Sequence, residues 1–130
     1  QRPFVLIIDT DVLIWDLRGN RKAREAIAGN LPFSISVITW MELVQGMKNK
    51  AELRTFLQQM RHWSVTILQL DRDISSRAMF YVEEFFLSHR LELADALIGA
   101  TAVHHNEPLL TANDRHYRHL PNIQLEKFLP

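Results

Sequence analysis

The sequence contains no cysteine, and this absence excludes several kinds of protein at once. A disulfide framework, a thiolate zinc site and a cysteine nucleophile all require that residue. Any metal ion must therefore be held by carboxylate, amide or imidazole groups. The length of 130 residues, 47% of them hydrophobic, suffices for one well-filled core but not for two ordinary domains, so residues 1–130 are expected to form a single domain.

The sequence also lacks a long apolar run and an excess of charge of one sign. No apolar run reaches the roughly 18 residues that span a bilayer, and the N-terminus has no basic-then-apolar secretory pattern. We therefore expect a cytoplasmic protein with no membrane partner. Because 15 basic residues balance 15 acidic ones, no global positive field attracts nucleic acid. Acidic residues gathered in one pocket would nevertheless leave the remaining surface net basic.

Strands and helices are predicted to alternate along the chain. Short β-branched or alternating segments predict five strands, at 4–8, 33–37, 65–68, 108–111 and 123–125. Periodic apolar segments predict five helices, at 21–28, from 39 to between 46 and 49, at 51–63, 71–89 and 93–103. The run from Phe4 to Ile8 is typical of a strand covered on both faces. This order predicts an α/β fold, a three-layer α/β/α sandwich around a mainly parallel sheet.

Two carboxylates follow the first two predicted strands. Asp9 comes directly after the first, and ligands of open α/β sheets bind at the carboxyl ends of strands. The structural alternative for Asp9 is an Asx turn, with Thr10 or Asp11 capping the next helix. Glu42 follows the second strand, but it also completes a capping box in which it would return to the backbone N–H of Thr39.

Asp95 interrupts Leu93–Ala100, a segment otherwise suited to the core. A buried, unpaired carboxylate costs several kcal/mol, whereas a helix N-terminus returns only about 0.3–1 kcal/mol. A cation or dense hydrogen bonding must supply the rest, which favours a functional role. After the strand at 108–111, Asn113 and Asp114 either face the same edge of the sheet or form a solvated turn.

Four dispersed segments carry motifs in a fixed order: residues 8–14 (IDTDVLI), 36–43 (SVITWMEL), 93–102 (LADALIGATA) and 110–117 (LTANDRHY). Together they resemble the PIN-domain ribonucleases, and within that family the VapC-type toxins of type II (VapBC) toxin–antitoxin systems, along nearly the whole chain. The resemblance implies a PIN-like fold and assigns acids of the site to Asp9, Glu42 and Asp95. In the last motif Asn113 stands where many relatives carry aspartate, and Asp114 follows it.

The resemblance implies a Mg²⁺- or Mn²⁺-dependent endoribonuclease that leaves a 5′-phosphate and a 3′-hydroxyl. Clustered carboxylates repel one another without a cation, and oxygen ligands without thiolate favour Mg²⁺ or Mn²⁺ over zinc. We hypothesise that Asp9 and Asp95 bind the main ion, with Glu42 as a further ligand that positions or deprotonates the attacking water. Asn113 or Asp114 would support a second ion or a water molecule.

Further residues are expected to support the site or to contact the substrate. Loops around the acids would be held by three threonines, Thr10, Thr39 and Thr111. RNA phosphates would be contacted, unless the segment is an ordinary polar loop, by Arg115, His116, Arg118 and His119. A zinc site formed by His104–His105 or by His116 and His119 is disfavoured, because surface histidines at a helix end or turn need no ligand.

The sequence contains more aromatic residues than one small core clearly accommodates; the set concerned is Trp15, Trp40, Phe80, Tyr81, Phe85 and Phe86. Most of them are expected in the core. Others would form a homodimer face and a groove for an antitoxin segment, as the resemblance implies. The expected partners are therefore an RNA substrate, a VapB-type antitoxin and a second copy of the chain.

Two other functions are compatible with the same residues. Asp9-Thr10-Asp11 after a strand is typical of a haloacid-dehalogenase-type phosphatase, with Asp9 as the phosphorylated nucleophile. The absence of paired late aspartates argues against it, as does the placement of the four lysines, Lys22, Lys48, Lys50 and Lys127. The other function is a PIN-like module that binds RNA or a partner without cutting, with which Asn113 in place of an acid is compatible.

Overall fold

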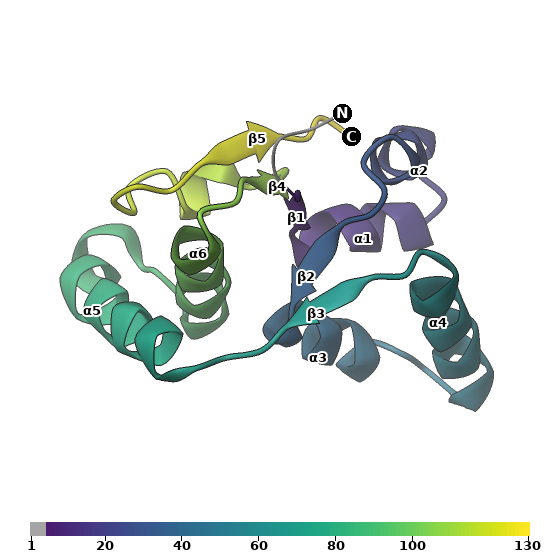
Figure 1. Cartoon of the computed structure of the whole chain (residues 1–130), viewed down its shortest axis with the longest axis horizontal. Coiled ribbons are helices and arrows are strands. Elements are labelled where there is room, and N and C mark those ends of the chain that lie inside the picture. Colours follow the sequence, from purple (N-terminus) through teal and green to yellow (C-terminus); the bar gives the residue numbers. More distant parts are fainter. Residues whose placement is uncertain (1–4) are drawn as a thin grey trace.

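A five-stranded sheet lies at the centre of the fold (Figure 1). The computed structural model describes residues 5–130, so Phe4 of the first predicted strand lies outside the described residues. The strands are β1 (Ile7–Ile8), β2 (Ser34–Ser36), β3 (Thr66–Leu68), β4 (Leu109–Thr111) and β5 (Leu125–Lys127). Their order is β3-β2-β1-β4-β5, and all four pairings are parallel.

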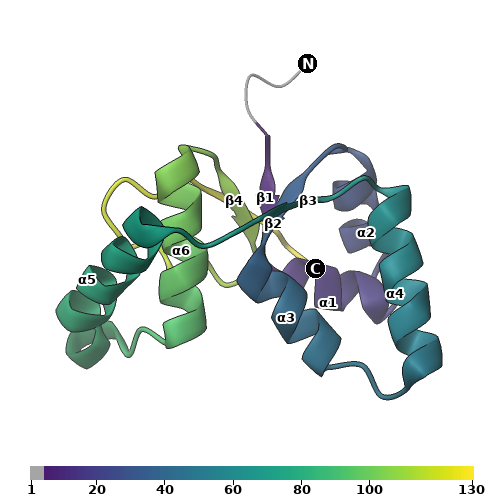
Figure 2. The ribbon, with the colours of Figure 1, turned by 60° about the horizontal axis from the view of Figure 1, so that its bottom comes forward.

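Helices cover both faces of this sheet. They are α1 (Thr10–Leu17), α2 (Arg21–Ala28), α3 (Val37–Gln45), α4 (Lys50–His62), α5 (Arg72–His89), α6 (Leu93–His105) and a 3-10 turn, η1 (Asp114–His116). Figures 1 and 2 show α5 and α6 on one side of the strands and α1, α2 and α4 on the other. The predicted α/β/α sandwich is confirmed. In the described part of the chain, no helix combines the length and apolar character that crossing a membrane requires.

The central strands contribute to a separate core on each face of the sheet. Successive side chains of a strand point to opposite faces. Ile7 and Leu109 pack in the core beneath α5 and α6, whereas Leu6, Ile8 and Leu110 pack in the core beneath α1 to α4. Burial on both faces explains the continuous apolar run that predicted β1. It also fixes the register, because a slip by one residue would exchange the two sets.

Helix α3 begins two residues earlier than expected. Its N-cap is Ser36, whose hydroxyl accepts a hydrogen bond from the backbone N–H of Ile38 at 3.0 Å. Thr39 therefore lies inside the first turn, and the predicted capping box between Thr39 and Glu42 is wrong. The apolar residues at 37 and 38 continue the strand-like pattern of β2, so the pattern alone did not locate the boundary. The Glu42 carboxylate is left available for other contacts.

Helix α1 was not predicted, although it positions the first acid. Asp9 is its N-cap, and Thr10 is its first residue. The Asp9 carboxylate, not Thr10 or Asp11, takes the capping role that the structural alternative had given to those residues. The helix has only eight residues, buries Val12 and Leu13, and has no clear polar face, so its apolar periodicity is weak.

Gly99 in α6 lets the segment after η1 lie directly against that helix. A Cβ atom at position 99 would lie 2.5 Å from Cδ1 of Leu120 and 3.4 Å from Cδ1 of Tyr117. Both neighbours are buried, so neither can move aside into solvent. This close approach holds Tyr117 beside α6.

We predict that Gly99→Ala destabilises the protein by about 1–3 kcal/mol, because overpacking a filled core outweighs the helix propensity of alanine. The free energy of unfolding is measured in urea. Gly46→Ala is the matched control, since a Cβ there would lie at an ordinary 3.5 Å from its nearest neighbour, the Leu43 carbonyl oxygen. Equal stability of the two variants would contradict the close approach at position 99.

Candidate active site

Polar residues from separate segments line one cavity of about 250 Å³. Asp9 follows β1, Glu42 lies on α3 after β2, Asn113 follows β4, and Asp95 lies in the first turn of α6. The full lining comprises Asp9, Thr10, Asp11, Ile14, Glu42, Glu92, Ala94, Asp95, Asn113 and His116. The cavity therefore lies at the carboxyl ends of parallel strands, where α/β sheets bind ligands. It brings together four of the five residues that the sequence assigned to catalysis.

Asp9 is only 5% exposed and forms part of the cavity wall. Its Oδ1 accepts a hydrogen bond from the backbone N–H of Thr10 and its Oδ2 one from the hydroxyl of Thr111, both at 2.8 Å. Burial, and then the charge of Asp11, raises the pKa of Asp9 to about 7. Without a cation, this carboxyl group therefore keeps its proton up to neutral pH.

Asp95 is held by two side chains from the segment after β4. Its Oδ1 accepts a hydrogen bond from the Tyr117 hydroxyl at 3.2 Å, and its Oδ2 lies 3.3 Å from Nδ1 of His116. Burial raises the pKa of Asp95, against the opposing effect of His116. Burial and the charges of Asp9 and Asp95 raise the pKa of Tyr117 well above its usual value, so its hydroxyl stays a donor to these carboxylates.

Glu42 is one of two exposed acids in the cavity wall, the other being Glu92, and Thr10 and Thr39 form a hydrogen-bonded chain that ends on it. The Thr10 hydroxyl donates to Oε1 of Glu42 at 2.7 Å and lies 2.9 Å from the Thr39 hydroxyl. A hydroxyl has one hydrogen, so when Thr10 donates to Glu42 it accepts from Thr39. All three predicted threonines, Thr111 included, thus contact an acid or its partner.

Asp11 is a cavity residue that the sequence analysis treated only as a cap or as part of a phosphatase motif. Its Oδ2 accepts hydrogen bonds from the backbone N–H of Ala112 at 2.9 Å and from Nδ2 of Asn113 at 3.0 Å. Burial raises its pKa. The spacing of two residues from Asp9 was the available signal, but the partners at 112 and 113 lie about a hundred residues away in sequence.

Other predicted residues lie around the cavity or away from it. Asp114 does not line it, and its Oδ1 lies 3.5 Å from Nζ of Lys127. Arg115 and Arg118 are exposed beside it in sequence. His119 stacks on His89 with 4.1 Å between ring centroids and does not line the cavity.

The donor set fits a hard divalent cation. All donors are carboxylate, amide, hydroxyl or imidazole groups, and Oδ1 of Asp11 is buried without a hydrogen-bond partner in the structure. Among residues 5–130, no three histidine or acidic side chains are already close enough together to hold a metal ion. A cation would therefore have to draw these side chains inward as it binds, and it would remove the cost of burying their charges.

The fold is that of a PIN domain. A family model described as "PIN domain" matches residues 6–122, and the chain belongs to that family. It is 33% identical over 117 residues to Ribonuclease VapC10 of Mycobacterium tuberculosis, an alignment that covers 87% of this chain and 86% of the relative.

Solved structures of other proteins have the same fold. A toxin–antitoxin complex from Klebsiella pneumoniae contains a chain 32% identical to this one, with a TM-score of 0.73, over 91% of this chain and 94% of that one. VapBC-1 from nontypeable Haemophilus influenzae is 20% identical, with a TM-score of 0.79, over 95% and 97% of the two chains, and supports the fold alone. The predicted resemblance to VapC-type members of the PIN family is confirmed.

We predict that Asp9→Asn stabilises the cation-free protein at alkaline pH. The raised pKa means that the folded state binds more protons than the unfolded state between about pH 4 and 7, so the wild type loses stability as pH rises through that range. The amide carries no charge to bury, which should raise the free energy of unfolding by about 1–3 kcal/mol at about pH 8 and by little at about pH 4.5.

Thermal unfolding with a chelator at both pH values measures this difference. Asp73→Asn, on the exposed first turn of α5, is the control and should match the wild type. A loss of stability in Asp9→Asn at the higher pH would contradict the argument that burying this charge is costly.

Proposed function

We propose that this chain is a Mg²⁺- or Mn²⁺-dependent endoribonuclease that acts as the toxin of a VapBC-type pair. The observation that carries the proposal is the meeting of Asp9, Glu42, Asp95 and Asn113 in one cavity at the carboxyl ends of the sheet. Membership of the PIN-domain family and the likeness to Ribonuclease VapC10 support it.

Asp9 and Asp95 are the proposed principal cation ligands, because both line the cavity, burial raises the pKa of both, and each is held in place by a hydroxyl donor. When bound, the divalent cation would polarise the scissile phosphate and neutralise the charge that develops on it. Tyr117 fixes Asp95 by donating a hydrogen bond to Oδ1. Thr111 fixes Asp9 in the same way.

Glu42 is the proposed general base. The Thr10 hydroxyl holds Oε1, so Oε2 is positioned to accept a proton from the attacking water. The water oxygen bonds to phosphorus, the bond from phosphorus to the 3′-oxygen breaks, and that oxygen takes a proton from solvent. The products are a 5′-phosphate and a 3′-hydroxyl. Asn113 supports the site through its amide, whereas Asp114 lies outside the cavity beside Lys127 and has no role in the proposed reaction.

RNA phosphates would approach from the side of η1. Arg115 and Arg118 are exposed there, and His116 lines the cavity with Nδ1 beside Asp95. Its other ring nitrogen, Nε2, can donate to a phosphate oxygen. An RNA substrate places the proposed activity in the cytoplasm.

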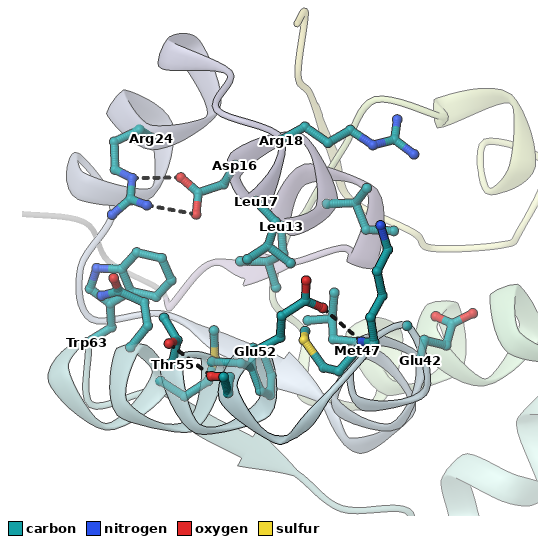
Figure 3. Close-up of a pocket in the computed structure, with 18 residues that line it drawn as sticks. Leu13, Asp16, Leu17, Arg18, Arg24, Glu42, Met47, Glu52, Thr55 and Trp63 are labelled. Carbon is teal, nitrogen blue, oxygen red and sulfur yellow. Dashed lines mark hydrogen bonds and ion pairs between the residues drawn. The ribbon is translucent and has the colours of Figure 1, made fainter.

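The proposed antitoxin would occupy a second, larger cavity of about 780 Å³ between α1 and α2 on one side and α3 and α4 on the other. Figure 3 shows Leu13, Leu17, Met47 and Trp63 around this groove, with Asp16 and Arg24 at one end. An apolar segment with polar ends fits this lining. The Klebsiella relative, solved as a toxin–antitoxin complex, supports an antitoxin as the occupant.

The groove and the acidic cavity are adjacent. Ile14 and Glu42 line both, so a segment lying in the groove would end beside the proposed general base. Such a segment would block the approach of RNA to Glu42. This geometry supports inhibition by an occupant of the groove.

A second copy of the chain is the proposed partner for the outer face of α5. Met79, Phe80, Phe86 and Leu87 are all exposed, Leu87 by 90%. The two pairs are seven residues apart, which is two helical turns, so they form one apolar stripe. A stripe of this kind marks an interface more often than a free surface.

The alternative functions are tested by the same residues. The phosphatase interpretation loses its basis with membership of the PIN family, and no lysine lines the acidic cavity. A PIN-like module that binds without cutting remains a possible outcome of the experiment below.

We predict that the antitoxin-free protein cleaves labelled RNA with Mn²⁺ or Mg²⁺ and not with chelator, and that folded Asp95→Asn loses at least about 100-fold in rate. Asp73→Asn removes a charge from an exposed turn and should cleave like the wild type. Circular dichroism establishes that each variant is folded.

Equal cleavage by wild type and Asp95→Asn would identify a contaminating nuclease. RNA binding without cleavage by either would favour the binding module. Expression of the same variants in a bacterial host separates toxin from RNA-processing enzyme: the toxin should arrest growth, Asp95→Asn should not, and a co-expressed cognate antitoxin should relieve the arrest.

We predict that Phe80→Ser with Leu87→Ser converts a dimer into a monomer, because it replaces the centre of the apolar stripe on α5 with polar groups. Light scattering after size exclusion gives the mass. Leu129→Ser, which also changes an exposed apolar residue, should remain dimeric. A monomeric wild type would contradict the proposed dimer face.

A further inference from the structure

Asp11 and Asn113 form a pair in the wall of the acidic cavity. Nδ2 of Asn113 donates a hydrogen bond to Oδ2 of Asp11 at 3.0 Å, across 102 positions of sequence. The backbone N–H of Ala112 donates to the same oxygen at 2.9 Å. The Thr111 hydroxyl lies 3.4 Å from it, although its shorter contact, 2.8 Å, is with Asp9. The loop after β4 therefore directs its donors at one oxygen of Asp11.

The other carboxylate oxygen of Asp11, Oδ1, has no such donor. Oδ1 is buried and has no hydrogen-bond partner in the structure, although burial without a partner is costly for a carboxylate oxygen. Asp9, by contrast, has a partner on each of its two oxygens. Asp11 thus adds a carboxylate with one enclosed, unsatisfied oxygen to the wall of a cavity that is also lined by the acids Asp9, Glu42, Glu92 and Asp95.

In the cation-free protein, an acid at position 113 would repel Asp11. A carboxylate in place of the Asn113 amide would lie about 3.0 Å from a second carboxylate and would lose the hydrogen bond that now joins them. The amide is therefore the group that satisfies Asp11 when no cation is bound. One negative charge can stand at position 11 or at position 113, with the uncharged partner holding it by a hydrogen bond.

We propose that Asp11 joins Asp9, Glu42 and Asp95 as the fourth acid that acts on the cation, through Oδ1, and that Asn113 is a positioning residue that orients Asp11. This inference rests on the proposed function, because it assumes a divalent cation in the same cavity. The acid that the motif at 110–117 lacks, because it has Asn113, is then supplied by Asp11 of the motif at 8–14. Neither Asn113 nor Asp114 then has to act as the fourth acid.

An exchange of the two side chains tests the proposal. Mn²⁺ binding is measured by titration calorimetry for the wild type, Asp11→Asn, Asn113→Asp and the double variant Asp11→Asn/Asn113→Asp, together with thermal unfolding of each. Asp11→Ser is measured in parallel, because serine keeps an oxygen acceptor for the loop if Asp11→Asn does not fold. Asp73→Asn is the control for loss of one exposed charge.

We expect Asp11→Asn to weaken Mn²⁺ binding by about 10- to 100-fold. Asn113→Asp should lower the thermal midpoint, since it places two carboxylates together. The double variant, with the charge moved across the pair, should bind Mn²⁺ within about threefold of the wild type. Asp73→Asn should bind like the wild type.

Wild-type affinity in folded Asp11→Asn or Asp11→Ser, with loss of binding in Asp95→Asn, would overturn the role of Asp11 and leave the proposed function standing. A double variant as weak as Asp11→Asn would overturn the exchange of charge between the two positions. If the wild type bound Mn²⁺ no better than Asp95→Asn throughout the titration, the proposed function itself would be overturned.

Discussion

The hydrogen bond from the Thr111 hydroxyl to Asp9 is the contact on which the arrangement of the site depends. It joins the ends of the two adjacent central strands, β1 and β4, at 2.8 Å. The same hydroxyl oxygen accepts from the backbone N–H of Asn113 at 3.0 Å, which turns the chain toward Asp11. Thr111 thus sets both the position of Asp9, the most deeply buried acid of the site, and the course of the loop that reaches Asp11. The parallel pairing of β1 with β4 makes this possible, because it brings both carboxyl ends to one edge.

The acids at this edge of the sheet are unfavourable for the stability of the fold. Burial raises the pKa of Asp9, Asp11 and Asp95, so each would be easier to accommodate as a neutral group. Two separate cores, one on each face of the sheet, offset that cost through apolar burial. The sequence keeps acids where an apolar or amide side chain would be more stable, which is typical of a functional site.

Much of the fold and of the site could be predicted from local patterns. The apolar run before Asp9 predicted a doubly covered strand, and Asp95 was identified because it interrupts an apolar helix. Helix α1 was not predicted because an eight-residue helix buried on several sides has no clear apolar period. The start of α3 was placed too late because Val37 and Ile38 extend the apolar pattern of β2. The role of Asp11 was not predicted because its partners at 112 and 113 are set by the pairing of β1 with β4, which no short segment encodes.

The placement of β4 beside β1 has a consequence for synthesis. The chain leaves the ribosome from its N-terminus, and β1 with α1 emerges long before Thr111 and Tyr117, which hold Asp9 and Asp95. Neither acid has its final partners until almost the whole domain has emerged. A nascent chain therefore carries these acids without an assembled site, so the proposed activity cannot begin until translation of the domain is nearly complete.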